Sequence, residues 1–321
     1  MKVISHLFDL ARSRSGRRTL NVVFALAAAG ATALAVRHFA KSGWPLQHAD
    51  VGLVAAAAAL FLAAYAFKAL GWRRLFAGHE RPSRHALAAA GGAASITGIA
   101  LPGRFDDVVR LAVVRRFRGR GPKAGLGAVC LSLVVVGLVD SAAITPLASV
   151  AAGLTPSSAG LQAGLALVAA AGVAAALLVL WLPRLARTER LSRFRISGWV
   201  REHSACSRET TKAWLLVSAS WSLRAVGLYV LLAALGVGGS FGLALLFLCA
   251  TAASTALPIA PAGQATQAGA GAAILVVAGV HSSHAVAFAI SAQALGILAG
   301  AAVVLMATIW EAGLRLRPLS E

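Results

Sequence analysis

Two stretches in which proline and glycine interrupt an apolar segment decide the fold of this 321-residue chain. The first, Gly98 to Arg104, reads GIALPGR, and the second, Leu257 to Gly263, reads LPIAPAG. At membrane depth, backbone released from helical hydrogen bonds must be buried in protein or line a cavity, because lipid offers it no partner. Interrupted segments at corresponding places in two halves of a chain are typical of a transport pathway.

The composition around these stretches is that of a polytopic membrane protein. Hydrophobic residues make up 59% of the chain, and the charges are grouped between apolar runs longer than the ~20 residues that one crossing needs. Asp140 is the only Asp, Glu, Lys or Arg in the interval 124–183, and Arg224 is the only one in the interval 213–310. These two intervals must therefore contain several crossings.

The formal net charge of +19 would suggest a nucleic-acid partner in a soluble protein. Here the arginines and lysines gather at the ends of apolar runs, where they mark the cytoplasmic side of a membrane protein. We therefore expect no nucleic-acid partner. Attraction to anionic lipid head groups is compatible with the same charge.

The distribution of Lys and Arg predicts six full crossings and two re-entrant helical hairpins. The crossings are expected at 19–39, 51–70, 124–152, 159–183, 213–235 and 285–310. Segment 85–101 has strongly basic flanks on both sides, and segment 241–280 has uncharged flanks on both sides. A segment with matching flanks is expected to enter and leave on one face, which is the cytoplasmic face for the first and the outer face for the second.

The expected fold is thus all-α, with one integral membrane domain over 1–321 arranged as an inverted repeat. Half one covers about 19–183, half two covers about 213–310, and the basic loop 184–212 joins them on the cytoplasmic side. Both termini are expected in the cytoplasm, and the protein is expected in the cytoplasmic membrane. The symmetry follows from charge counting and from the number of crossings.

The string PGRFDDVVR, from Pro102 to Arg110, is the strongest local signal in the chain. Pro102 ends a helix, Gly103 permits close backbone approach, and arginine binds phosphate through two parallel N–H groups. Arg104 and Arg110 are therefore candidates for binding a lipid phosphate. The alternative, which stays open, is that they mark the cytoplasmic face and pair with Asp106 and Asp107.

With these motifs, the sequence resembles the integral-membrane domain of lysylphosphatidylglycerol synthases and their stand-alone, flippase-like relatives. The family typically has Pro-Gly-Arg-x-Gly-Glu-x-x-Arg in its first half, matched here by Pro102, Gly103, Arg104, Asp107 and Arg110. Of the second motif, Pro-Gly-Gly-x-Gly-x-x-Glu, Pro261 and Gly263 are present, whereas Ala265 and Ala268 replace a glycine and the acid. The resemblance implies a divergent member. Because no synthase domain follows in this chain, it does not imply aminoacyl transfer.

Asp140 and Arg224 each lie inside a predicted crossing, where a charge costs at least ~2.5 kcal/mol on insertion scales. A Glu-Arg-x-x-Asp element of the family would place its acid at Asp140. One interpretation is an Asp140–Arg224 ion pair between the two halves. The other makes Arg224 a phosphate anchor for the head group, or Asp140 a proton-coupling acid.

The second interruption is neutral, and it offers Pro261, Gly263, Gln264 and Gln267 as groups that could line a passage or bind a polar head group. The usual motifs of nucleotide hydrolysis, nucleophilic catalysis and metal binding are not found in the sequence. We therefore expect no enzyme activity, no catalytic residue, no metal and no cofactor.

The sequence as a whole predicts a transporter that moves a phospholipid or a polyprenyl-phosphate-linked lipid between leaflets, with membrane lipids bearing anionic phosphate as its partners. One alternative is a membrane scaffold that binds a glycosyl- or aminoacyl-transferase through the loop 184–212. A second is an enzyme acting on lipid phosphate with Asp106 and Asp107.

Overall fold

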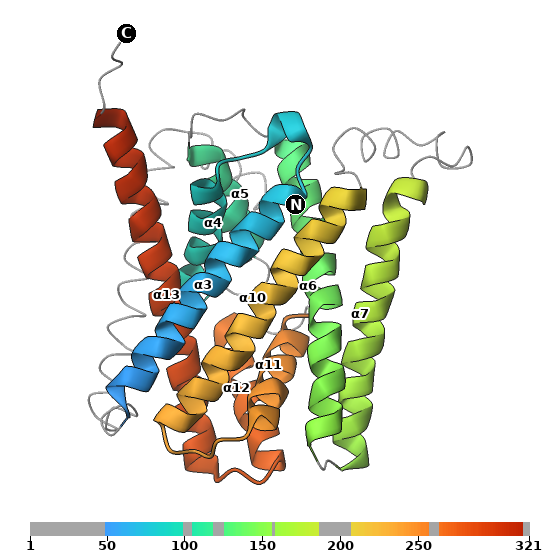
Figure 1. Cartoon of the computed structure of the whole chain (residues 1–321), viewed down its shortest axis with the longest axis vertical. Helices are drawn as coiled ribbons and strands as arrows, with labels where there is room; N and C mark the ends of the chain where they lie inside the picture. Colours follow the sequence, from blue (N-terminus) through green and yellow to red (C-terminus); the bar gives the residue numbers. More distant parts are fainter. Residues whose placement is uncertain are drawn as a thin grey trace, which may run out of the picture.

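The computed structural model describes residues 49–98, 105–117, 125–155, 158–185, 207–256 and 263–316. Over these ranges the chain is helical and contains no β-strand (Figure 1). The elements are α3 (Val51–Arg74), the 3-10 helix η1 (Gly78–Glu80), α4 (Arg84–Thr97), α5 (Phe105–Arg116), α6 (Leu126–Leu154), α7 (Ala159–Leu185), α10 (Ser207–Ala234), α11 (Phe241–Ala256), α12 (Gly263–Val277) and α13 (Ser282–Leu316).

Five of the described helices, α3, α6, α7, α10 and α13, are long and apolar enough to cross a bilayer. They correspond to five of the six predicted crossings, while the sixth, 19–39, lies outside the described residues. Asp50 begins α3 by accepting hydrogen bonds from the backbone N–H groups of Gly52 and Leu53, at 2.8 and 3.1 Å. The prediction of an all-helical, multi-pass membrane protein is confirmed at this level.

The other four α-helices are short, with 14 residues in α4, 12 in α5, 16 in α11 and 15 in α12. Each is shorter than the ~20 residues of a full crossing. α4 contacts α5 near the end of the bundle where α3 stops, and α11 contacts α12 near the opposite end (Figure 1). The interruptions between these helices lie outside the described residues, so the re-entrant hairpins and the inverted repeat stay predictions.

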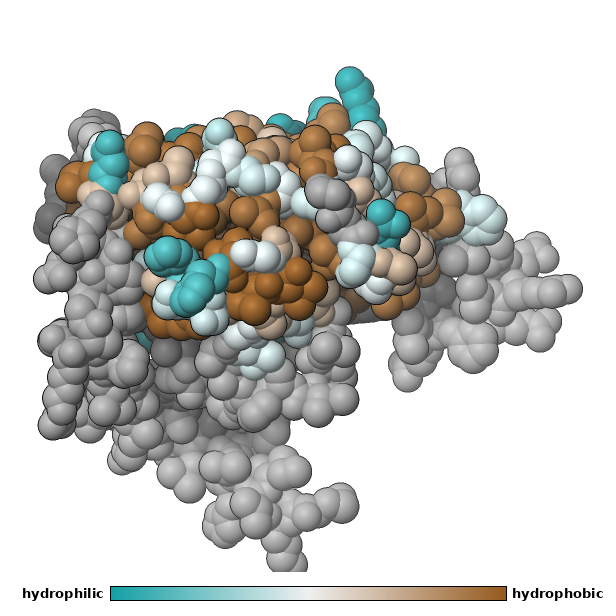
Figure 2. Space-filling model, turned by 90° about the horizontal axis from the view of Figure 1, so that it is seen from below, coloured by the Kyte–Doolittle hydropathy of each residue, from teal (hydrophilic) through white to brown (hydrophobic). Residues whose placement is uncertain are grey.

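The end of the bundle at which α10 stops has few strongly hydrophilic residues on its described surface (Figure 2). The turn at 236–240 and the turn at 279–281 lie at this end and contain no Asp, Glu, Lys or Arg. The sparse charge is the same feature that led us to predict this end as the outer one. The orientation in the membrane stays a prediction.

Helices α3 and α10, from the two predicted halves, make the most extensive helix contact of the described structure. Gly71 lies directly against Val217, and Gly227 lies directly against Phe61. The hydroxyl of Ser220 donates a hydrogen bond of 2.8 Å to the carbonyl of Ala64. Small residues at a crossing allow two backbones to approach closely, which strengthens van der Waals packing between helices in lipid.

Ion pairs also join α3 and α10 where α3 ends and α10 begins. The carboxylate of Glu209, in the first turn of α10, contacts Arg74 at 3.0 Å, Arg81 at 2.8 Å and Lys212 at 3.2 Å. Arg74 ends α3, and Arg81 follows η1. The α3–α10 pair is thereby held both along its length and at the basic end of the bundle.

The variant Gly92→Ala is expected to destabilise the contact between α4 and α13. A Cβ atom at Gly92 would lie 2.3 Å from the carbonyl oxygen of Gly300, which belongs to a packed backbone. Overpacking of this kind costs about 1–3 kcal/mol. The matched control is Gly91→Ala on the same helix, where the nearest atom would be 3.8 Å away. Thermal unfolding in detergent should show a lower Tm for Gly92→Ala than for the native chain, and an unchanged Tm for Gly91→Ala. Equal Tm values for the two variants would contradict the prediction.

Candidate functional site

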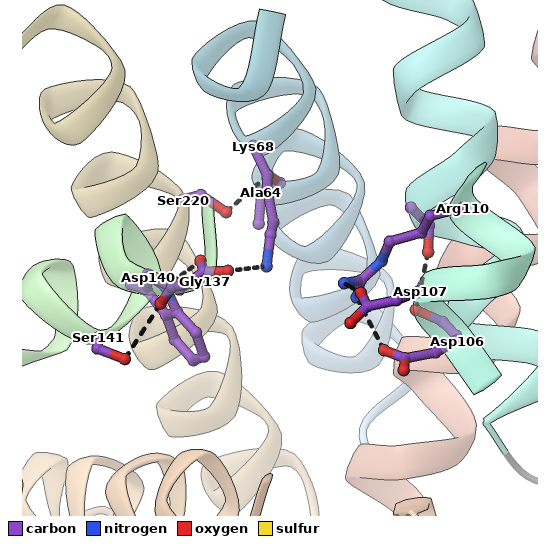
Figure 3. A network of polar contacts seen from close by, with 12 residues as sticks. Ala64, Lys68, Asp106, Asp107, Arg110, Gly137, Asp140, Ser141 and Ser220 are labelled. Carbon is purple, nitrogen blue, oxygen red and sulfur yellow. Dashed lines mark hydrogen bonds and ion pairs between the residues drawn. The ribbon is translucent and has the colours of Figure 1, made fainter. Parts of the chain in front are cut away.

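An ion pair between Lys68 of α3 and Asp140 of α6 lies in the interior of the bundle (Figure 3). The ammonium nitrogen is 2.9 Å from Oδ2 of the carboxylate. The other carboxylate oxygen, Oδ1, accepts a hydrogen bond of 2.9 Å from the indole N–H of Trp221 on α10. Three membrane-crossing candidates therefore meet at one carboxylate.

The Lys68–Asp140 pair is partly accessible, with 23% and 21% of the two side-chain surfaces exposed. Neither side chain is fully enclosed, so another group can approach the pair. This accessibility makes the pair a candidate for function as well as for stability.

The predicted ion pair between Asp140 and Arg224 is wrong, because the carboxylate pairs with Lys68. In the described part of the chain no ion pair joins Asp140 to Arg224. Lys68 comes from α3, which crosses α10 in the core, and its flexible four-carbon stem brings the ammonium to the carboxylate. The sequence contained a signal for this residue, since Lys68 is the only charged side chain between Asp50 and Arg73.

Arg224 lies instead against two aromatic rings. Its guanidinium carbon is 5.3 Å from the ring centroid of Tyr65 and 5.4 Å from that of Trp221. Its Nε atom is buried without a hydrogen-bond partner among the described residues, and no carboxylate of that part of the chain pairs with it. Cation–π contacts stabilise a guanidinium but leave its N–H groups unsatisfied. Arg224 therefore offers its buried Nε–H donor to an anion.

The ring of Tyr65, one of the two beside Arg224, is held in place by hydrogen bonds of its hydroxyl group. Its hydroxyl is hydrogen-bonded to the hydroxyl of Ser95 on α4, and it donates a hydrogen bond of 3.1 Å to the carbonyl of Gly296 on α13. The ring of Tyr65, which belongs to α3, is thus also tied to α4 and α13. Trp221, the second ring, is held through its indole N–H by Asp140.

We call Tyr65, Lys68, Asp140, Trp221 and Arg224 the central charge cluster. Its aromatic members touch every cation in it, because Lys68 also lies 5.7 Å from the ring centroid of Trp221.

On α5, Arg110 pairs with both carboxylates of its own first turn (Figure 3). Its guanidinium is 2.9 Å from Asp107 and 3.3 Å from Asp106. Pairing with these aspartates was the alternative to phosphate binding for Arg110, and it is the arrangement seen here. In the described part of the chain, no group of three or more His, Cys, Asp or Glu side chains that could hold a metal ion is found.

The remaining predicted site residues are only partly described. Pro102, Gly103, Arg104 and Pro261 lie outside the described residues. The backbones of Gly263 and Gln264 begin α12, and Gln267 is partly buried in the next turn of that helix. Within the described part of the chain, no hydrogen bond or ion pair connects Gln267 to the central charge cluster.

Long apolar helices around an internal charge cluster define the chain as a multi-pass helical membrane protein. Residues 18–304 match the family model described as the lysylphosphatidylglycerol synthase TM region. The chain belongs to this family, which confirms the resemblance found in its first motif. No curated protein and no solved structure matches the chain significantly.

Proposed function

We propose that this protein translocates a phospholipid or a polyprenyl-phosphate-linked lipid between the leaflets of the cell membrane, and that Arg224 binds the phosphate of the head group. The observation that carries the proposal is the guanidinium of Arg224, which lies in the middle of a candidate crossing without a carboxylate partner among the described residues. Charged residues within crossings usually pair with one another or mark a substrate pathway. Membership of a membrane family named for a lipid synthase supports a lipid as the cargo.

The geometry of Arg224 suits a phosphate. The guanidinium carbon lies over the rings of Tyr65 and Trp221, and its Nε–H group has no hydrogen-bond partner among the described residues, so this donor remains available. Two parallel N–H groups fit two phosphate oxygens. Lys68 adds a second positive charge beside the same Trp221 ring, while the acyl chains of the lipid remain in the bilayer.

The two pairs of short helices complete the proposed pathway. In this mechanism α4 with α5, and α11 with α12, are re-entrant hairpins that enter from opposite faces, and their interrupted backbones line the passage. Arg104 and Arg110 make the first contact with the phosphate at the cytoplasmic end. Arg110 then exchanges Asp106 and Asp107 for phosphate oxygens.

Reconstitution into liposomes with fluorescent phospholipids tests the proposal. The native chain should exchange lipid between leaflets faster than liposomes without protein. The double variant Arg104→Ala, Arg110→Ala should slow exchange at least about fivefold, because two charge-assisted contacts to phosphate are lost. The matched control is Arg115→Ala with Arg116→Ala, which removes two exposed arginines of the same helix.

Exchange equal to that of protein-free liposomes would contradict transport. Co-purification of the same inactive protein with a lipid-modifying transferase would then favour the scaffold function. If the Arg104→Ala, Arg110→Ala variant exchanged lipid as fast as the native chain, the proposed contact at the cytoplasmic end would be contradicted. Transport itself would still be supported.

A further inference from the structure

We propose that the central charge cluster selects head groups that have one net negative charge and no ammonium group, and that Lys68 is the residue that sets this selectivity. The inference rests on the proposed function, because it concerns the head group that Arg224 binds. It names the substrate class as anionic phosphodiester lipids, as opposed to zwitterionic or cationic aminolipids.

The first argument is the charge balance of the cluster. Lys68 and Asp140 compensate each other at 2.9 Å, so within the central charge cluster Arg224 has no carboxylate partner among the described residues. A phosphodiester with a single negative charge would make the cluster neutral. In a region of low dielectric, a neutral arrangement is strongly favoured over one with an unpaired charge.

The second argument is that a head-group ammonium would find its binding groups already occupied. An ammonium ion is bound by a carboxylate and by the face of an aromatic ring. Both oxygens of Asp140 are in use, one by Lys68 and the other by Trp221. The ring of Trp221 is flanked by Lys68 and Arg224, and that of Tyr65 by Arg224.

Lys68 thus lies where the ammonium of an aminolipid would bind. Its nitrogen is 2.9 Å from the carboxylate and 5.7 Å from the Trp221 centroid, which is the environment of a bound ammonium ligand. The other carboxylates that the structure describes near the cluster, Asp106 and Asp107, both pair with Arg110. At the central charge cluster, an aminolipid would therefore have to displace Lys68, whereas an anionic lipid would not.

The selectivity should change in a defined way when Lys68 is replaced. Lys68→Met keeps the length of the side chain but removes the charge, which frees Asp140 for an ammonium. Lys68→Met with Asp140→Asn removes both charges, so no carboxylate remains to receive one. Lys68→Arg keeps the cation and serves as the conservative control.

The test is competition for the purified full-length chain in detergent, using dioleoyl-phosphatidylglycerol as the anionic lipid and dioleoyl-phosphatidylethanolamine as the aminolipid. We expect the native chain and Lys68→Arg to prefer the anionic lipid by about tenfold, the effect of one well-placed charge contact. Lys68→Met should reduce this preference at least fivefold. The double variant should restore it, which also excludes misfolding of the single variant as the cause.

Equal affinity of the native chain for the two lipids would overturn the inference. So would a preference that Lys68→Met leaves unchanged, or one that the double variant fails to restore. Selective binding together with no exchange in liposomes would keep the inference and contradict transport. Exchange of both lipids at equal rates, with equal binding, would keep transport and contradict the inference.

Discussion

Asp140→Asn is expected to lower the free energy of unfolding by about 3 kcal/mol, because it leaves the ammonium of Lys68 without its counter-ion. Removing one partner of a buried ion pair typically costs about 3–5 kcal/mol. We expect the lower end of that range, since the two side chains retain 23% and 21% of their exposure. The neutral amide can still accept the hydrogen bond from Trp221, so the loss reports mainly on the charge.

A double-mutant cycle isolates this effect. Lys68→Met with Asp140→Asn removes both charges and should recover most of the lost stability, because the uncompensated charge disappears. The measurement is unfolding of the purified protein in detergent, followed by tryptophan fluorescence. If Asp140→Asn were as stable as the native chain, the pair would contribute little and Lys68 would have found another anion.

Of the charged residues in the cluster, Asp140 and Arg224 could be recognised as internal from the sequence, whereas Lys68 could not. Asp140 and Arg224 each stand alone in a long apolar interval, and this isolation marks them as internal. Lys68 lies close to Arg73 and Arg74 and so resembles a residue at the end of a crossing. Only the packing of α3 across α10, which also contacts α6, together with the ion pair to Asp140, shows that its ammonium points inward.

The partners within the cluster depend on how the helices are rotated about their axes, which a hydropathy pattern does not determine. Trp221 and Arg224 are three residues apart on α10, so they lie on one face of the helix. Their proximity could be predicted from this spacing. The contribution of Tyr65 could not, because its ring reaches Arg224 from another helix and is held there by Ser95 and Gly296.

Helix ends were predicted less well than helix identity. The crossing predicted at 285–310 corresponds to α13, which runs from Ser282 to Leu316. Hydropathy marks where the bilayer ends, whereas a helix continues into water as long as its residues permit it. The start of α4 follows local chemistry, since the Ser83 hydroxyl accepts a hydrogen bond of 3.1 Å from the Ala86 N–H.

Arg224→Gln is expected to reduce lipid exchange in liposomes by about 10- to 100-fold. Hydrogen bonds to a charged group contribute about 1.5–3 kcal/mol, and each 1.4 kcal/mol corresponds to a factor of ten in affinity. Arg224→Lys should give an intermediate rate, because it keeps the charge but loses the planar fork and part of the stacking on Tyr65 and Trp221. The matched control is Arg208→Gln, an exposed arginine in the first turn of the same helix.

The stability of the same variant separates a role in transport from a role in folding. Arg224→Gln removes a charge that has no carboxylate partner in the described structure, and it loses two cation–π contacts. These effects oppose each other, so the free energy of unfolding should change by less than about 1 kcal/mol. A large loss of exchange with little loss of stability is the expected result for a residue whose partner is the cargo. Strong destabilisation with proportionate loss of exchange would instead assign Arg224 to the fold.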